Sequence, residues 1–167
     1  MATHYDGTER ERRALDAYIK LMRSTVAVNA RLFPVLQAEF GITPSQLGVL
    51  EALSHLGPMP HCALASKLLV SASNLTTVLD NLERDGLVKR QRNTADRRVS
   101  ITSLTAAGEA RLASFFPAHV ARLVEALSTL DPDEQEELGR LCRKLGRSAA
   151  GPTASHDVPS ARTMMRA

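Results

Sequence analysis

The chain of 167 residues has few of the features that mark secreted or membrane-embedded proteins. It contains two cysteines, Cys62 and Cys142, which lie far apart in the sequence. Cys142 falls in the apolar stripe of the expected last helix, where we expect it to be packed. Two distant cysteines supply no disulfide framework, so we expect a reducing, cytoplasmic compartment. No apolar run approaches membrane-spanning length, and residues 1–13 are too polar and charged for a secretory signal. We therefore expect no membrane partner.

Motifs that carry enzyme chemistry are also missing from the sequence. We find no glycine-rich phosphate loop, no nucleophile elbow and no metal-binding pair of histidines on one helix. His55, His61 and Cys62 are close in sequence but do not have the spacing of a zinc site. The acidic residues 131–137 stand at the expected start of a helix, where carboxylates favour the helix dipole. The sequence thus predicts neither an enzyme nor a bound cofactor or metal.

The composition is that of an ordinary globular protein. Apolar residues make up 44% of the chain and charged residues 23%, and the formal net charge is +3. This length suits one well-buried domain and is short for two. Because the net charge is small, the position of the basic residues is more informative than their number.

Residues 71–85 have the pattern of a helix with one apolar and one polar face. Leu75, Val78, Leu79 and Leu82 recur at i, i+3, i+4 and i+7 and share the apolar face. The remaining surface carries short hydroxyl and amide side chains, which match the donors and acceptors of base edges in a major groove. The residues that we expect to contact DNA from this helix are Ser71, Ser73, Asn74, Thr76, Thr77 and Arg84.

A basic hairpin follows this helix directly. Residues 88–92 and 98–103 alternate as strands do, and residues 93–96 supply turn chemistry between them. We expect the cations of the first strand mainly to contact phosphates, with the alternative that every second residue of this strand points inward at the helices. We expect the arginines of the turn to enter a minor groove. An alternative is a solvated hairpin tip with no ligand. The residues concerned are Lys89, Arg90, Arg92, Asp96, Arg97 and Arg98.

Five further helices are predicted around this unit, over residues 11–40, 43–56, 61–69, 105–127 and 131–146. Apolar residues recur every seven positions in the first of them, as in helices that pack against a partner helix. Pro34 is expected to kink or break its last turn. Thr43 and Gln46 form a capping box at the start of the second helix. The fold class is therefore mainly α with a small β-hairpin wing: a winged helix-turn-helix with a helical dimerisation region.

Three stretches of the sequence resemble the MarR family of winged-helix transcriptional regulators. Residues 43–50 are similar to the second helix of that family. Residues 80–90 are similar to the end of its recognition helix and its first wing strand. Asp96, Arg97 and Arg98, followed by residues 104–108, resemble its wing signature. The resemblance extends over roughly residues 15–147.

The resemblance implies a homodimer that binds a palindromic operator on double-stranded DNA. A separate argument agrees, because the apolar stripes of the first and last helices are too wide for the DNA-binding region to cover. Two-fold symmetry places the half-sites about 10 base pairs apart. The expected organisation is a disordered N-terminal arm (1–10), a dimerisation helix (11–40), the winged helix-turn-helix (41–104), two dimerisation helices (105–148) and a flexible C-terminal tail (149–167).

The same resemblance implies a small-molecule effector, which lowers the affinity for the operator when it binds. We expect an aromatic or phenolic compound or a quinone, and a repressor that is released by it. Candidate polar groups of the effector pocket are Asn29, His55 and His119; each has a structural role as the alternative. In the family pattern the acidic residue before the wing arginine orients it, which would make Asp96 the partner of Arg98.

Two alternative functions remain open from the sequence. In the first, Cys62 is a redox-responsive thiol whose pKa is lowered by the start of the helix that carries it. Against it, the chain has no cysteine near the start of the first helix, where some relatives sense oxidants. In the second, the fold is used as a protein-binding adaptor without DNA.

Overall fold

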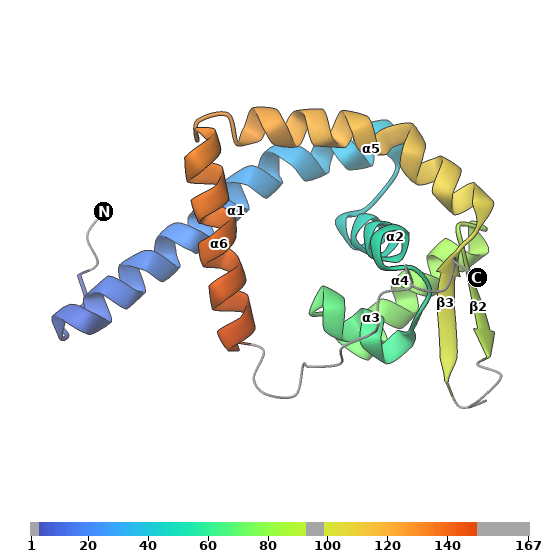
Figure 1. The fold of residues 1–167 in the computed structure, drawn as a ribbon, viewed down its shortest axis with the longest axis horizontal. Coiled ribbons are helices and arrows are strands. Elements are labelled where there is room, and N and C mark those ends of the chain that lie inside the picture. The colour runs from blue at the N-terminus through green and yellow to red at the C-terminus, as the bar shows by residue number, and fades with distance from the viewer. Residues whose placement is uncertain (1–3, 93–98, 150–167) are drawn as a thin grey trace, which may run out of the picture. The chain divides into compact units, whose positions relative to one another are not determined.

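The structure, a computed structural model, describes residues 4–92 and 99–149 (Figure 1). The chain divides into two compact units, of which the first ends at Thr129 and the second begins at Leu130. The helices of the first unit are α1 (Glu9–Phe40), α2 (Pro44–Leu56), α3 (His61–Leu68), α4 (Ala72–Arg84) and α5 (Ala106–Ala126). Its strands are β1 (Met59–Pro60), β2 (Val88–Arg92) and β3 (Ser100–Leu104). The second unit contains α6 (Pro132–Ala149).

Helix α1 starts at a capping box and runs without a break to a glycine. At its start, the Thr8 side chain accepts a hydrogen bond from the Glu11 amide, and the Glu11 carboxylate accepts one from the Thr8 amide. The hydrogen bond from the Thr8 backbone lowers the pKa of Glu11. Gly41, at φ 63°, ends the helix. The prediction that Pro34 breaks the last turn is wrong. Leu32 and Leu36 are buried on either side of Pro34 and hold the helix against the core.

Helix α2 begins as the sequence predicts. The Thr43 side chain accepts from the Gln46 amide at 3.2 Å, and the Gln46 side chain accepts from the Thr43 amide at 2.9 Å. Pro44 occupies the first turn, where its missing amide proton is not needed. Gly57 ends α2 at φ 79°.

A three-stranded antiparallel sheet, in the order β1-β3-β2, replaces the predicted hairpin. The sequence predicts β2 correctly, but it places the next strand at 98–103 rather than Ser100–Leu104 and misses β1. Strand β1 has two residues and includes a proline, so its sequence reads as a turn; Pro60 is tolerated because β1 is an edge strand. Thr102, on the central strand, is fully buried.

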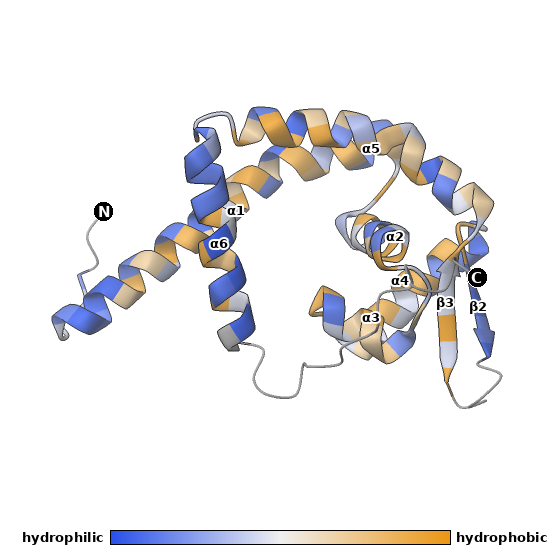
Figure 2. Cartoon of the chain, in the orientation of Figure 1, coloured by the Kyte–Doolittle hydropathy of each residue, from blue (hydrophilic) through white to orange (hydrophobic). Residues whose placement is uncertain are grey.

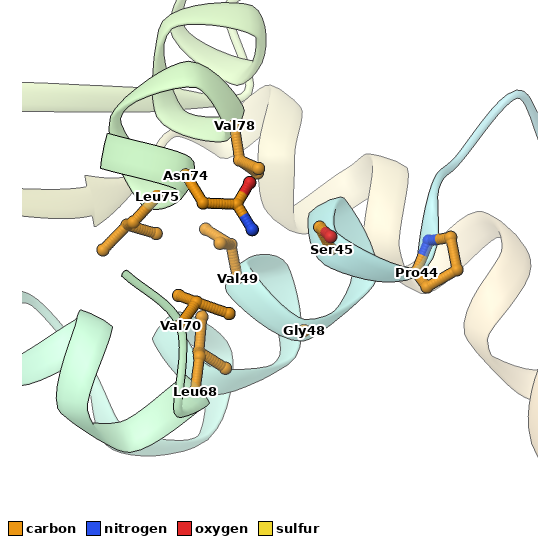
Figure 3. A pocket seen from close by; sticks show the side chains of 9 residues that line it. All are labelled: Pro44, Ser45, Gly48, Val49, Leu68, Val70, Asn74, Leu75 and Val78. Carbon is orange, nitrogen blue, oxygen red and sulfur yellow. The ribbon is translucent and has the colours of Figure 1, made fainter. Parts of the chain in front are cut away.

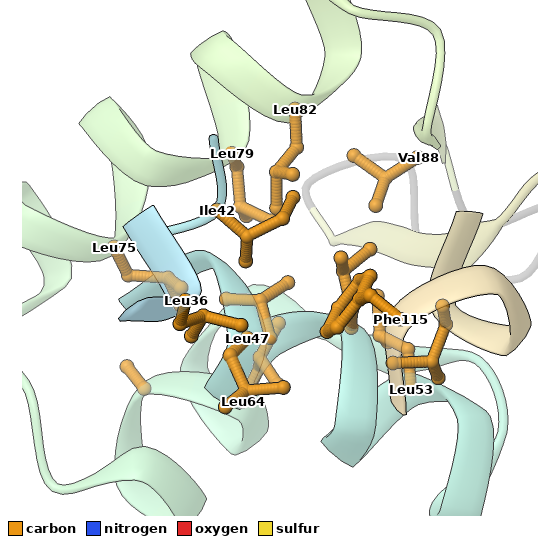
Figure 4. Packing of buried hydrophobic residues seen from close by; sticks show 14 residues of the cluster. Leu36, Ile42, Leu47, Leu53, Leu64, Leu75, Leu79, Leu82, Val88 and Phe115 are labelled. Atoms are coloured by element: carbon orange, nitrogen blue, oxygen red, sulfur yellow. The ribbon is translucent and has the colours of Figure 1, made fainter. Parts of the chain in front are cut away.

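The core is built from α2, α3, α4, β2 and the end of α1 and lies around Phe115 of α5 (Figure 4). Leu50, Leu64, Leu79 and Leu82 are fully buried in it. Helix α5 packs along α1, where the rings of Phe40 and Phe115 lie 5.7 Å apart. These contacts fix the orientation of α4, whose apolar face is buried and whose polar face is not.

The start of α5 packs closely on the segment between α4 and β2. The Thr105 hydroxyl donates to the carbonyl of Gly86 at 2.7 Å and accepts from the Gly108 amide at 3.0 Å. A Cβ atom at Gly108 would stand 2.0 Å from the carbonyl oxygen of Leu87, so the first turn of α5 requires a glycine. This contact joins the wing to the long helix.

The second unit is helix α6, which begins with a reciprocal cap between Asp131 and Glu134. Residues 131–147 are all exposed in the single chain, including Cys142, which we expected from its place in the apolar stripe to be packed. The prediction that Cys142 is packed is therefore wrong for the single chain, because no side chain of α6 over this range is buried.

The segments expected to be disordered are only partly described. Residues 1–3 and 150–167 lie outside the described residues, while Glu9 and Arg10 belong to α1 and Ala149 to α6. In the part of the chain that is described, no single helix is long and apolar enough to cross a membrane; α3 and α4 together reach that length but are bent by 109°.

Candidate nucleic-acid interface

Helices α3 and α4 form a helix-turn-helix. The angle between them is 109°, within the range of about 90–120° typical of this motif. Leu69 and Val70 make the turn, and Leu69 has φ 54°, a left-handed conformation that residues other than glycine and asparagine seldom adopt. Its side chain is 88% exposed. The turn therefore sets the start of α4 at a fixed angle to α3.

Helix α4 has the two faces that its sequence predicts. Ser71 caps it by accepting from the Asn74 amide at 3.2 Å. Leu75, Leu79 and Leu82 are buried against the core. The residues with a predicted role in DNA contact are all exposed: Ser71, Ser73, Asn74, Thr76, Thr77 and Arg84. Arg84 lies 3.5 Å from Asp85, and its role, like the others, stays a prediction.

The threonine hydroxyls of this face already have partners within the protein. Thr76 donates its hydroxyl proton to the carbonyl of Ala72 at 2.8 Å, and Thr77 donates to that of Ser73 at 3.3 Å. Both threonines therefore keep acceptor lone pairs and a methyl group for a ligand. A methyl group suits apolar contact with thymine, and a lone pair suits an exocyclic amino group.

His61 is a residue of this surface that the sequence did not reveal. Its Nε2 atom lies 3.2 Å from the Thr76 hydroxyl, across the angle between α3 and α4. Because that hydroxyl already donates to Ala72, the imidazole is the donor in this pair. The sequence does not indicate this contact, because His61 and Thr76 are 15 positions apart and meet only through the angle between α3 and α4.

Arg90 joins the wing to α4 instead of facing outward. Its guanidinium lies 2.7 Å from Asp80 and 2.5 Å from Glu83, and its backbone amide donates to Glu83 at 3.0 Å. The hydrogen bond from Arg90 lowers the pKa of Glu83, and the Glu83 carboxylate raises the pKa of Arg90. The sequence prediction makes Arg90 a phosphate contact; with its guanidinium engaged by two carboxylates, we assign it instead to positioning β2.

Lys89 and Arg92 are the exposed cations of β2. Neither forms an ion pair with another described residue, so both are available to phosphates. The turn of the wing, with Asp96, Arg97 and Arg98, lies outside the described residues. The predicted role of these three residues, including the pairing of Asp96 with Arg98, stays a prediction.

The three candidate effector residues lie on three different helices, α1, α2 and α5. Asn29 is half-buried on α1, and His55 is exposed in the last turn of α2. His119 is half-buried on α5, its ring 6.3 Å from that of Phe116. None of the three lines either of the two best-defined cavities, one between α2 and α4 and the other on α6.

Cys62 is the cysteine of this region, and metal-binding groups are considered with it. Cys62 is an exposed free thiol in the first turn of α3. Among the described residues, no group of three or more histidine, cysteine, aspartate or glutamate side chains is arranged to hold a metal ion. The surface around α4 is therefore characterised by hydroxyl, amide and cationic groups.

A helix-turn-helix with an exposed polar second helix, followed by a sheet with outward cations, defines a winged-helix DNA-binding protein. Comparison with known proteins agrees. The model of the MarR family matches residues 42–100. The HTH-type transcriptional regulator MhqR of Bacillus subtilis (strain 168) is 30% identical over 137 residues, which cover 82% of this chain and 94% of MhqR.

Two further relatives extend the comparison. The HTH-type transcriptional regulator YkoM of the same strain is 38% identical over 108 residues, 65% of this chain and 70% of YkoM. Sco3205, a MarR family transcriptional regulator from Streptomyces coelicolor solved in complex with DNA, is similar with a TM-score of 0.75 and 25% identity, over 92% of this chain and 97% of that one. The chain belongs to the MarR family: it is a DNA-binding transcriptional regulator and not an enzyme.

Proposed function

We propose that the protein is a homodimeric repressor that occupies a palindromic operator and is released by a small aromatic or phenolic compound or a quinone. The observation that carries the proposal is the exposed polar face of α4 beside the outward cations of β2. Occupying an operator is sufficient to exclude a polymerase, whereas activation needs a further contact surface. Repression is therefore the simpler consequence of this architecture.

Exposed apolar side chains on α1, α5 and α6 support the homodimer. Large apolar residues are exposed on these three helices. Hydrophobic residues recur along α1 and α5 in Figure 2. Single exposed leucines are common on protein surfaces, but rows of them mark interaction sites. On these three helices, the large apolar residues with 38% to 66% exposure are Tyr18, Met22, Val26, Val120, Val124, Leu138, Leu141 and Leu145.

In the proposed complex, α4 enters the major groove through its first two turns. Ser73, Asn74, Thr76 and Thr77 contact base edges, and the positive end of α4 lies near a phosphate. Lys89 and Arg92 hold the backbone, and Arg97 and Arg98 reach the minor groove. We add His61 as the residue that orients the Thr76 hydroxyl.

The effector part of the proposal depends on the resemblance to ligand-responsive regulators. Binding of the compound would favour a conformation in which the two α4 helices of the dimer no longer fit consecutive major grooves. Asn29, His55 and His119 remain candidate contacts. A thermal-shift screen with aromatic acids, phenols and quinones tests this part, because a ligand that binds the folded dimer raises its melting temperature.

The test of DNA binding uses a lysine pair. Lys89→Ala should weaken binding to a duplex from the region upstream of the protein's own gene, and to duplexes of other sequence by a similar factor. It should also reduce the slope of log affinity against log salt concentration by about 1, because one phosphate contact is lost. Lys20→Ala, which removes the same charge from α1, is the control and should leave both quantities unchanged. Fluorescence anisotropy from low to high salt measures them. Equal slopes for wild type and Lys89→Ala would overturn the wing assignment.

A second candidate is a thiol switch, favoured by the exposure of Cys62 on the helix that also carries His61. Oxidation at Cys62 would place a polar group next to the His61–Thr76 contact and disturb α4. Mild peroxide treatment followed by mass spectrometry is the test, with Cys142 in the same sample as an internal comparison. Unmodified Cys62 at an operator-releasing peroxide dose would exclude this mechanism.

A further inference from the structure

The hydroxyl of Thr76 belongs to a chain of hydrogen bonds that crosses the helix-turn-helix. It donates its proton to the carbonyl oxygen of Ala72, one turn earlier on α4, at 2.8 Å. The Nε2 atom of His61, at the start of α3, lies 3.2 Å from the same hydroxyl oxygen. Among the described residues this hydroxyl has no third partner. Because Thr76 is exposed on the polar face of α4, the rest of its hydroxyl is open to a ligand.

The direction of both hydrogen bonds follows from which atoms carry protons. Two oxygen atoms 2.8 Å apart need a proton between them, and a carbonyl has none, so the proton is that of Thr76. The hydroxyl can then only accept from His61, and the imidazole is the donor. A hydroxyl has one proton and two lone pairs, of which His61 uses one pair. Thr76 therefore presents a ligand with one lone pair and no proton.

Thr77 lacks this fixed polarity. Its hydroxyl bonds to the carbonyl of Ser73 at 3.3 Å, and no described residue donates to it. Its proton can turn outward at the cost of one long bond, so Thr77 can meet a donor or an acceptor. Turning the Thr76 proton outward would break a shorter bond, which His61 strengthens because hydrogen bonds in a chain polarise one another.

The other polar side chains in the first turn of α4 also lack a fixed polarity. The hydroxyls of Ser71 and Ser73 lie 3.1 Å apart, and either of them can be the donor. The Asn74 amide extends from α4 towards α2 (Figure 3), and an amide carries both donors and an acceptor. A definite base preference therefore follows from Thr76, and not from these neighbours.

We propose that Thr76 reads the exocyclic amino group of an adenine or a cytosine in the major groove, and that His61 secures this preference by holding the hydroxyl as an acceptor. At the equivalent place, guanine and thymine present a carbonyl oxygen. A carbonyl oxygen facing the lone pair of Thr76 would leave two acceptors without a proton between them. The inference rests on the proposed entry of α4 into the major groove, and it adds the class of base that one position of each half-site carries.

A library of randomised duplexes locates the position that Thr76 reads, by sequencing of the bound fraction. The wild type should favour adenine or cytosine at one position of each half-site. Thr76→Val keeps the shape of the side chain and removes the hydroxyl, so it should lose this preference and keep the others. Thr76→Ser keeps the hydroxyl and should retain it. Thr77→Val is the matched control and should leave this position unchanged. Circular dichroism checks that each variant is folded.

A duplex that lacks this one amino group measures its contribution directly. Unsubstituted purine replaces adenine, or 2-pyrimidinone replaces cytosine, at the position that the library identifies. Loss of one hydrogen bond to a base should weaken binding by the wild type about fivefold. Thr76→Val should bind both duplexes alike, and it also corrects for any effect of the altered base pair on the duplex itself. Fluorescence anisotropy of the labelled duplexes gives the affinities.

His61 acts through Thr76, so its variants are judged by base preference rather than by affinity. His61→Leu removes the donor and should reduce the preference for an amino group at this position. His61→Gln supplies an amide N–H in place of the imidazole N–H and should restore the preference. A purely structural role of His61 would change the affinity for all sequences alike and leave the base preference as it is.

Three results would overturn the inference, and each leaves DNA binding intact. The first is an unchanged library profile for Thr76→Val, which would remove Thr76 from base reading. The second is a preference for guanine or thymine at the position that depends on the Thr76 hydroxyl. The third is the same preference in wild type, His61→Leu and His61→Gln, which would overturn the role of His61. A wild type that binds no duplex even at low salt would instead overturn the proposed function.

Discussion

Thr102 is fully buried on the central strand of the sheet, and its hydroxyl has no hydrogen-bond partner among the described residues. A buried polar group without a partner costs about 1–3 kcal/mol. Thr102→Val replaces the hydroxyl by a methyl group of similar size, so we expect the free energy of unfolding to rise by about 1 kcal/mol. Urea denaturation measures it.

Thr105→Val is the control for this prediction. Its hydroxyl caps α5 and donates to the carbonyl of Gly86, so the same change should lower the stability by about 0.5–2 kcal/mol. If both valine variants were destabilised alike, a polar partner for Thr102 would have to be present in solution.

The pair Glu83–Arg90 makes part of the stability depend on pH. Hydrogen bonding from Arg90 holds the pKa of Glu83 below its ordinary value of 4.5. A carboxylate with a lowered pKa stabilises the folded state above pH 4.5, and this contribution is lost as the pH falls through its folded-state pKa. Because Glu83 is 37% exposed, we expect a loss of about 0.5–1 kcal/mol.

Glu83→Gln tests the pair. The variant should be less stable than the wild type at pH 7, and the difference should shrink between pH 4.5 and pH 3. Urea denaturation at each pH measures the two proteins side by side. A constant difference across this range would show that the carboxylate charge of Glu83 does not contribute.

At the level of single residues, the caps were predictable and the ion pairs were not. Ser71 and Thr43 are recognisable because a cap is defined by neighbours in the sequence. Arg90 reads as one more cation of a basic strand, since the sequence does not show that Glu83 lies within reach of it. Whether a charge faces solvent or a carboxylate is decided by tertiary packing.

The start of α5 packs tightly against the segment that leads into β2. Gly108 stands where a methyl group would overlap the carbonyl oxygen of Leu87. Gly108→Ala should therefore lower the free energy of unfolding by about 1–3 kcal/mol, since either α5 or the wing must shift. Operator affinity should fall as well, because the wing is displaced.

Gly139→Ala is the matched control, because a Cβ atom at Gly139 would meet nothing within 4 Å. In a helix interior this change should raise the stability by up to about 1 kcal/mol. Urea denaturation and anisotropy on the operator give both values. Equal changes in the free energy of unfolding for the two alanine variants would mean that α5 and the segment before β2 can shift apart without loss of stability.

Elements of the fold were predictable where the sequence pattern is long. The helices of residues 11–40 and 71–85 were found to within two residues, because many apolar positions repeat in each. Pro34 misled the prediction, since the buried Leu32 and Leu36 outweigh the local effect of a proline. Strand β1 was missed because two residues carry no periodicity, and it exists only through its pairing with β3.

For the whole molecule, the exposed apolar side chains of α1 and α6 predict that a charged substitution among them dissociates the proposed dimer. Val26→Glu and Leu141→Glu should each shift the protein from dimer to monomer, because a carboxylate would be buried without a partner. Sedimentation velocity measures the mass, and operator affinity should fall with it, since one recognition helix binds alone.

Ser24→Glu is the control on the same helix, because Ser24 is exposed and polar and lies on another face of α1. It should sediment as the wild type does. If the wild type itself sediments as a monomer at the concentration that binds the operator, the proposed homodimer is wrong. The sequence indicates that these helices need a cover, but a single chain does not contain the surface that provides it.

The left-handed turn at Leu69 has a consequence for heat resistance. A left-handed backbone costs about 1–2 kcal/mol for an ordinary residue and little for asparagine. Leu69→Asn should therefore raise the melting temperature by a few degrees, measured by calorimetry. Because asparagine keeps the left-handed turn that sets α4 at its angle to α3, the variant should bind the operator as the wild type does, so that heat resistance rises at this position without a change in DNA binding.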